Sequence, residues 1–184
     1  MANTFPGTTI EVTHLEKGSS KQLFDGIFAA GGITLSQVCV MTSLEPYMIQ
    51  NWVKRGFLSP PQKRLYSKEQ FARIVIINML REALQLDHIC KLLQVIGGAL
   101  DDATDDLISD DALYHRYVDM LTEPNIRLSD AESVQAAVCA VSSEYRERLP
   151  GGRKLLERIL QVMLYAHAAA DFRKTAEEIL SSLQ

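Results

Sequence analysis

The sequence has few cysteines and no long apolar run, and these shortages exclude several classes of protein. Its three cysteines, Cys39, Cys90 and Cys139, lie far apart, whereas disulfide frameworks and zinc sites need closely spaced pairs. We therefore expect three buried thiols. The longest apolar stretches, such as residues 74–80, are far shorter than the roughly 20 residues that cross a bilayer. No membrane span is expected.

Signals for secretion and for catalysis are also missing. The start of the chain lacks the basic segment, apolar run and small-residue cleavage site of a signal peptide, so a cytoplasmic protein is expected. No glycine-rich phosphate loop or nucleophile elbow is found, and the four histidines occur singly. The acidic run at residues 101–111 lacks the glycine and glutamate of a calcium loop and is expected to be a solvated connection. We expect no enzyme, no metal and no cofactor.

What is present is an ordinary globular composition with an uneven distribution of charge. Hydrophobic residues make up 47% of the 184 residues and charged residues 23%, which predicts a folded protein. The formal net charge is −4. Residues 46–82 contain seven basic and two acidic residues, a net charge of +5, whereas residues 83–128 contain three basic and nine acidic residues, a net charge of −6. A basic module followed by an acidic one is therefore predicted.

Capping signals and helical periodicity predict an all-α protein. Thr34 and Gln37, and Ser67 and Gln70, have the spacing of capping boxes, and Ser129 and Glu132 repeat it. The expected organisation is a loose arm at 1–18, a winged helix-turn-helix domain at 19–98, and a helical region at 99–184 that dimerises or senses an effector. The individual helices are expected at about 19–30, 35–42, 46–55, 68–84, 88–96, 109–121, 129–149 and 153–183.

The helices expected at 35–42 and 46–55, separated by a three-residue turn, have the order of a helix-turn-helix. Trp52 is expected in the core, while the outward positions of the second helix are polar and suit a major groove about 12 Å wide. A short hairpin or wing is predicted around Pro60 and Pro61. Tyr66 could either pack or touch a phosphate. The candidate DNA-binding residues are Tyr47, Gln50, Asn51, Lys54, Arg55, Lys63, Arg64, Tyr66 and Lys68.

Residues 33–93 resemble the DNA-binding module of the MerR family of bacterial regulators. Residues 35–60 follow the first two helices of that family without a gap, and Gly56-Phe57-Leu58-Ser59-Pro60 is similar to its Gly-Leu-Leu-x-Pro. Arg64-Leu65-Tyr66 is similar to its Arg-x-Tyr, and residues 86–93 resemble its Ser-Leu-x-x-Ile-x-x-Leu-Leu. The whole chain more closely resembles an uncharacterised family of bacterial proteins of unknown function that carries this module.

The resemblance implies a transcriptional regulator that binds double-stranded DNA as a homodimer, with no effector identified. The last helix has apolar residues at 3/4 spacing, from Leu155 through Ile159, Val162 and Ala166 to Leu183, which could pair with a partner helix. A second apolar face could instead bury this helix within the monomer. Two alternatives to DNA binding stay open: a protein-interaction module, and a small-ligand-binding helical protein.

Overall fold

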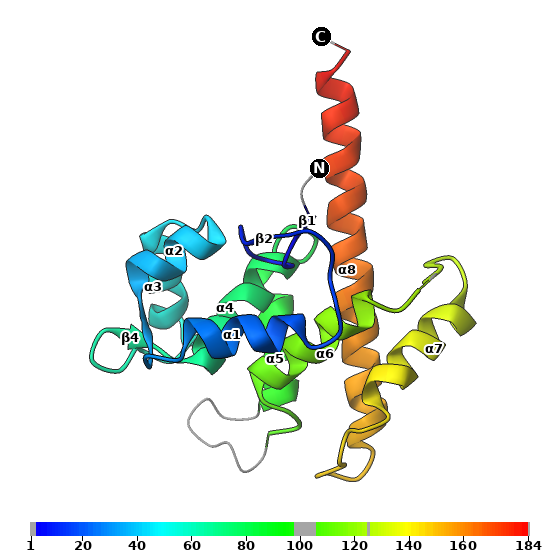
Figure 1. The fold of residues 1–184 in the computed structure, drawn as a ribbon, viewed down its shortest axis with the longest axis horizontal. Coiled ribbons are helices and arrows are strands. Elements are labelled where there is room, and N and C mark those ends of the chain that lie inside the picture. The colour runs from blue at the N-terminus through cyan, green and yellow to red at the C-terminus, as the bar shows by residue number, and fades with distance from the viewer. Residues whose placement is uncertain (1–2, 98–105, 125, 184) are drawn as a thin grey trace.

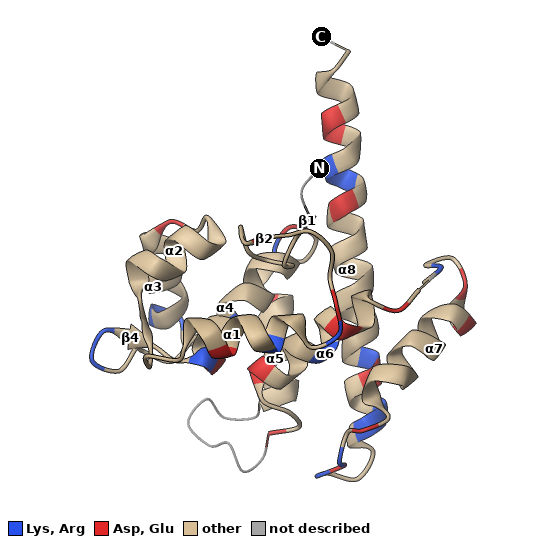
Figure 2. Ribbon diagram, in the orientation of Figure 1, with Lys and Arg blue, Asp and Glu red and all other residues tan. Residues whose placement is uncertain are grey.

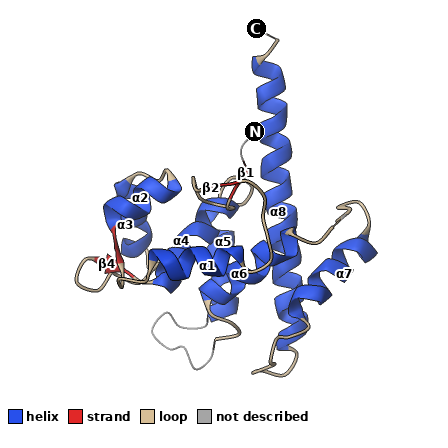
Figure 3. Ribbon diagram, in the orientation of Figure 1, coloured by secondary structure: helices blue, strands red, loops and turns tan. Residues whose placement is uncertain are grey.

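The computed structural model describes residues 3–97, 106–124 and 126–183 (Figure 1). Helices dominate the described chain, and the strands form only two small two-stranded sheets (Figure 3). This confirms the predicted helical class. The helices are α1 Ser19–Ile27, α2 Leu35–Thr42, α3 Pro46–Lys54, α4 Lys68–Leu80, α5 Leu86–Gly97, α6 Asp110–Leu121, α7 Ala131–Ser142 and α8 Gly152–Ser181. The strands are β1 Asn3–Thr4, β2 Glu11–Val12, β3 Ile33–Thr34 and β4 Leu65–Tyr66.

Two of the three predicted capping boxes begin helices. At α2 the Thr34 hydroxyl accepts from the Gln37 backbone N–H while the Gln37 side chain accepts from the Thr34 N–H, and Ser67 and Gln70 do the same at α4. These reciprocal bonds satisfy amide groups that have no partner within the helix. The third box is wrong, because α7 is capped by Asp130, whose carboxylate accepts from two backbone N–H groups.

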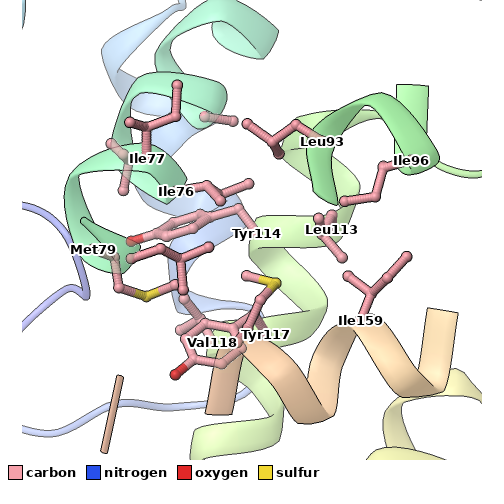
Figure 4. Packing of buried hydrophobic residues seen from close by; sticks show 14 of the residues in the cluster. Ile76, Ile77, Met79, Leu93, Ile96, Leu113, Tyr114, Tyr117, Val118 and Ile159 are labelled. Carbon is pink, nitrogen blue, oxygen red and sulfur yellow. The ribbon is translucent and has the colours of Figure 1, made fainter. Parts of the chain in front are cut away.

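The core is built around α4. Residues 71–77 of this helix are all buried, and it packs against α2, α5, α6 and α8. An aromatic group surrounds Phe24 of α1. The ring centroid of Phe24 lies 5.2 Å from that of Phe71 in α4 and 5.3 Å from that of Tyr114 in α6. Figure 4 shows how Tyr114 and Tyr117 lie among aliphatic side chains from α4, α5 and α8. A helix with apolar residues on every face must be buried on every face, as α4 is.

The amino-terminal segment is folded against this core, where the sequence predicts a loose arm. Strands β1 and β2 pair antiparallel, and Phe5 is buried. The Tyr114 hydroxyl donates to the Pro6 carbonyl oxygen at 2.9 Å, and the Asn78 amide donates to the Gly7 carbonyl oxygen at 2.9 Å. Gly7 has φ +74°, and a Cβ there would lie 2.3 Å from the Val75 carbonyl oxygen, so the approach requires glycine.

One hydrophobic cluster includes residues from all the helices. The predicted boundary between residues 98 and 99 and the first part of the acidic run, residues 101–105, lie outside the described residues. On either side of that gap, α4 and α6 pack directly together. Three helices also end at least three residues earlier than predicted: α1 at Ile27, α4 at Leu80 and α7 at Ser142. After α7 the Tyr145 N–H donates to the Ser142 carbonyl oxygen.

The long carboxyl-terminal helix α8 has two different halves. Its first half packs against α4, α6 and α7, burying Leu156, Leu160, Met163 and Leu164. From Asp171 onward every described residue is exposed, and the helix extends beyond the body of the molecule (Figure 1). No described helix is both long enough and apolar enough to span a membrane.

Candidate nucleic-acid interface

Helices α2 and α3 form a tight pair at one end of the molecule (Figure 1). The turn between them depends on Ser43, which has φ 54°, a left-handed conformation that is uncommon outside glycine. Leu44 in this turn is buried, as are Ile49 and Trp52 on the inner face of α3. The prediction that Trp52 is a core residue is confirmed. This burial fixes which face of α3 meets the solvent.

The outer face of α3 is polar and accessible. Tyr47, Gln50, Asn51 and Lys54 are all exposed, with Tyr47 at 68%. They occupy positions i, i+3, i+4 and i+7, so they form one stripe along the helix. Their side chains make no hydrogen bond or ion pair with the described residues. Four adjacent polar side chains that are hydrated and not bound to other protein groups are thus available to a ligand.

A hairpin places two cations at the tip of a strained turn. The Leu65 N–H donates to the Gln62 carbonyl oxygen at 2.8 Å, closing a four-residue turn whose central residues are Lys63 and Arg64. Their φ angles are 50° and 66°, the signs of a type I′ turn, which normally uses Asn-Gly. For ordinary L-residues this left-handed conformation costs about 1–2 kcal/mol each. The fold therefore holds two basic side chains outward at an energetic cost.

The hairpin is anchored to the helix pair by contacts that the sequence does not reveal. Strand β4 pairs antiparallel with β3, the two residues before α2. This pairing needs Gly32, because a Cβ there would lie 2.8 Å from Leu65 Cβ and 2.9 Å from the Tyr66 carbonyl oxygen. On the other arm, the Gln70 amide donates to Ser59 and to the Pro60 carbonyl oxygen. The hairpin tip therefore has a fixed position relative to α3.

Two of the predicted phosphate-binding cations have partners within the protein. Arg55 donates to the Asp87 carboxylate at 2.9 Å and lies 4.5 Å over the Phe57 ring. The Lys68 ammonium lies 3.3 Å from Asp111 and 3.6 Å from Asp25. Partial burial opposes its protonation, but hydrogen bonds and charges from these two aspartates raise the pKa of Lys68. Lys68 is therefore a structural cation. The ion pair between Arg55 and Asp87 is exposed, so Arg55 can leave Asp87 and bind another anion at little cost in free energy.

Tyr66 lies away from the candidate surface. Its side chain is 3% exposed and belongs to the hydrophobic core, and this burial raises the pKa of its hydroxyl. The ring therefore cannot contact a phosphate in this conformation. Of the two roles that the sequence left open for Tyr66, the structure selects packing.

Fewer basic side chains are available at the surface than the seven lysines and arginines of residues 46–82 predict. Arg73 is buried against Asp110, and Arg81 lies 3.6 Å from Glu82. The cations of this module that have no ion-pair partner among the described residues are Lys54, Lys63 and Arg64. Figure 2 shows basic residues at the tip of the hairpin, at the same end of the molecule as α3. The positive charge is thus concentrated next to the polar stripe.

The described residues offer no alternative metal site. No group of three histidine, cysteine or acidic side chains comes together in the part of the chain that the structure describes. Asp110 and Asp111, at the end of the acidic run, bind Arg73 and Lys68. All three cysteines are free thiols, but only Cys90 is fully buried; Cys139 is exposed, contrary to the expectation of three buried thiols.

Comparison with known proteins finds two similarities, the first of which includes this part of the chain. Residues 33–117, which run from β3 to α6, match the family model of a domain of unknown function, DUF1836. A relative, the uncharacterized protein YkrK of Bacillus subtilis (strain 168), is 28% identical over 131 residues. That alignment covers 63% of this chain and 56% of YkrK, so the chain spans little more than half of that relative. No solved structure matches.

These findings correct the resemblance to the MerR family. The matching family model is that of DUF1836, and no MerR or other helix-turn-helix family matches the chain. The motifs that suggested MerR are short glycine, proline and apolar patterns, and such patterns reflect local turn and capping requirements that unrelated proteins share. The assignment to MerR is therefore wrong.

Proposed function

We propose that this protein binds double-stranded DNA, with α3 in the major groove and the Lys63–Arg64 turn on the phosphate backbone, and that it acts in transcriptional regulation as a homodimer. The observation that carries the proposal is the strained turn, which holds two cations outward at the same end of the molecule as the polar face of α3 (Figure 2). Neither cation has an ion-pair partner among the described residues. Backbone strain of this kind clusters at functional sites.

The dimensions and chemistry of α3 support a role in reading bases. Its nine residues span about 13 Å at 1.5 Å per residue, which is close to the width of the major groove. Gln50 and Asn51 carry side-chain amides, which can bond the N6 and N7 atoms of adenine in a bidentate manner. Tyr47 and Lys54 lie at either end of the same stripe, where the phosphates that border the groove would be.

The proposal is tested by titrating a fluorescent pool of random-sequence duplexes with the protein and following the anisotropy at low salt. We expect Lys63→Ala/Arg64→Ala to weaken binding about tenfold, equivalent to ~1.4 kcal/mol. The matched control is Arg146→Ala/Arg148→Ala, which removes two exposed cations from the segment between α7 and α8, away from the hairpin (Figure 1). It should bind like wild type.

Two results would contradict the proposal. Absence of binding by folded wild-type protein would favour a protein-interaction module or a ligand-binding protein. Equal losses in the two double variants would mean that only overall charge matters and that the turn has no specific role.

A further inference from the structure

Helix α8 carries an unpaired apolar stripe with coiled-coil spacing. Its members are separated alternately by three and four residues, and all are exposed, with Phe172 at 69% and Ile179 at 58%. This is the a/d pattern of a heptad repeat. The stripe consists of Val162, Tyr165, Ala169, Phe172, Ala176 and Ile179, with Leu183 just beyond the end of the helix.

This stripe differs from the one that the sequence predicts. Ile159 and Ala166, which the predicted seam includes, are buried within the monomer. The exposed stripe instead includes the aromatic residues Tyr165 and Phe172. The body of the protein thus occupies one side of α8 and leaves a second apolar side exposed for more than two heptads.

We propose that this stripe binds the same stripe of a second copy of the chain, forming an antiparallel two-helix coiled coil. Residue size is the first reason. In an antiparallel pair, Tyr165 of one copy faces Ala176 of the other, Ala169 faces Phe172, and Val162 faces Ile179. Every aromatic residue then meets an alanine, which allows the layers to interdigitate. In a parallel pair, aromatic residues would face aromatic residues and alanines would face alanines, leaving some layers crowded and others empty.

Charge favours the same partner and the same register. The positions that flank the stripe are mostly neutral: Ala166, Ala168, Thr175 and Leu180, with Arg173 as the exception. In the proposed register Arg173 lies near Ala166 of the other copy. A shift by one heptad toward the carboxyl ends of the helices would bring the two copies of Arg173 together, and like charges at such flanking positions oppose pairing.

The extent of the stripe also suits a dimer contact. The helical part, from Val162 to Ile179, is about 26 Å long at 1.5 Å per residue. At roughly 10 Å across, such a strip covers of the order of 260 Å² on each copy in projection, a small area that is typical of a weak, concentration-dependent dimer. The antiparallel arrangement places the two bodies at opposite ends of the helix pair, since α8 extends beyond the body on one side only (Figure 1).

The dimer is independent of DNA binding and is tested without DNA. Sedimentation equilibrium of the full chain from low to high micromolar concentration should show a monomer–dimer equilibrium. Phe172→Glu/Ile179→Glu should be monomeric throughout. Lys174→Glu, on the same exposed half of α8 but outside the stripe, should dimerise like wild type, and circular dichroism should show equal helix content in all three. A monomeric wild type, or a dimer that survives the double substitution, would overturn the proposal.

Orientation is tested by the distance between nitroxide labels on Ser181→Cys, in a chain whose accessible Cys39 and Cys139 are replaced by serine. In the antiparallel register Ser181 lies opposite residue 160 of the other copy, so the two labels are separated by about 31 Å along the axis. A measured distance of this order supports the arrangement. A distance under about 20 Å would indicate parallel helices and overturn it.

Discussion

The Arg73 side chain donates from Nε to the Asp110 carboxylate at 2.6 Å, and this buried pair joins α4, which follows the hairpin, to α6. Both side chains are about one-tenth exposed. The bond crosses the gap at residues 98–105 and thereby connects the amino-terminal module to the carboxyl-terminal region. Because both charges are buried, loss of either partner should be costly, but the two losses should differ.

We expect Asp110→Asn to reduce the free energy of unfolding by about 3–5 kcal/mol, because arginine cannot lose its proton and would lose the carboxylate to which it donates while staying buried. Arg73→Met should cost less, since Asp110 can become neutral: burial raises the pKa of this carboxyl even though Arg73 opposes the shift. Urea denaturation of both variants at pH 7 checks the order. The opposite order would contradict this account.

The Arg73→Met variant should also depend on pH in a defined direction. Without Arg73 the pKa of Asp110 in the folded state rises further above its pKa in the unfolded state. Protonation of Asp110 therefore stabilises the folded variant at a pH below the unfolded pKa. This stabilisation is lost as the pH increases through the folded pKa. The difference between variant and wild type should therefore shrink as the pH is lowered from 7 towards 5. A constant difference would show that Asp110 does not titrate there.

The strained turn makes stability and binding separable. Replacing Lys63 and Arg64 by Asn and Gly supplies the pair that type I′ turns prefer, so Lys63→Asn/Arg64→Gly should raise the free energy of unfolding by about 1–2 kcal/mol. The same substitution should weaken DNA binding, because both cations are lost. Urea denaturation and anisotropy on one protein preparation measure both effects. A more stable protein that binds DNA as wild type does would contradict the proposed role of the turn.

Base reading by α3 is tested by selecting preferred sites from a random duplex library. Asn51→Ala should relax the preference at one base position, by about 1–3 kcal/mol, while Lys54→Ala should weaken binding equally for all sequences. The two residues are exposed on the same stripe, so each serves as the control for the other. If Asn51→Ala selects the same sites as wild type, then Asn51 does not read a base.

The contact between Tyr117 and His167 predicts acid sensitivity. The Tyr117 hydroxyl oxygen on α6 lies 2.6 Å from His167 Nδ1 on α8. Burial lowers the pKa of His167 despite the opposing charge of Asp171. A histidine with a lowered folded pKa stabilises the fold above its unfolded pKa, near 6.5, and this stabilisation is lost as the pH decreases through the folded value.

The melting temperature of wild type should therefore fall between pH 7.5 and 5.5, and it should fall less in His167→Gln. Burial lowers the pKa of His115 as well, so part of the decrease should remain in that variant. An equal decrease in both proteins would show that His167 does not contribute.

The sequence predicted those parts of the fold that depend on neighbouring residues. The capping boxes at Thr34 and Ser67 were correct because a cap and its partner lie three residues apart. Gly32 has a role that no local pattern reveals, because it lets β3 approach β4 across more than 30 residues of chain. The folded arm at 3–12 was missed for the same reason, because its contacts are with α2, α4 and α6.

The candidate site was predictable in position but not in composition. Periodicity correctly assigned Trp52 to the core and Gln50 and Asn51 to the surface. It could not show that Lys68 pairs with Asp111, since the two residues are separated by most of α4, α5 and the following segment. Net charge over a stretch of sequence counts such cations as available, although the fold has already neutralised them.

The salt dependence of DNA binding reports on contact between the Lys63–Arg64 turn and the phosphates. Each phosphate contact contributes roughly 0.9 to the slope of the logarithm of the association constant against the logarithm of salt concentration. Lys63→Ala/Arg64→Ala should therefore reduce the magnitude of this slope by about 1.8 relative to wild type. The control Arg146→Ala/Arg148→Ala should leave it unchanged. Identical slopes for all three proteins would show that the turn does not contact the DNA backbone and would contradict the proposed interface.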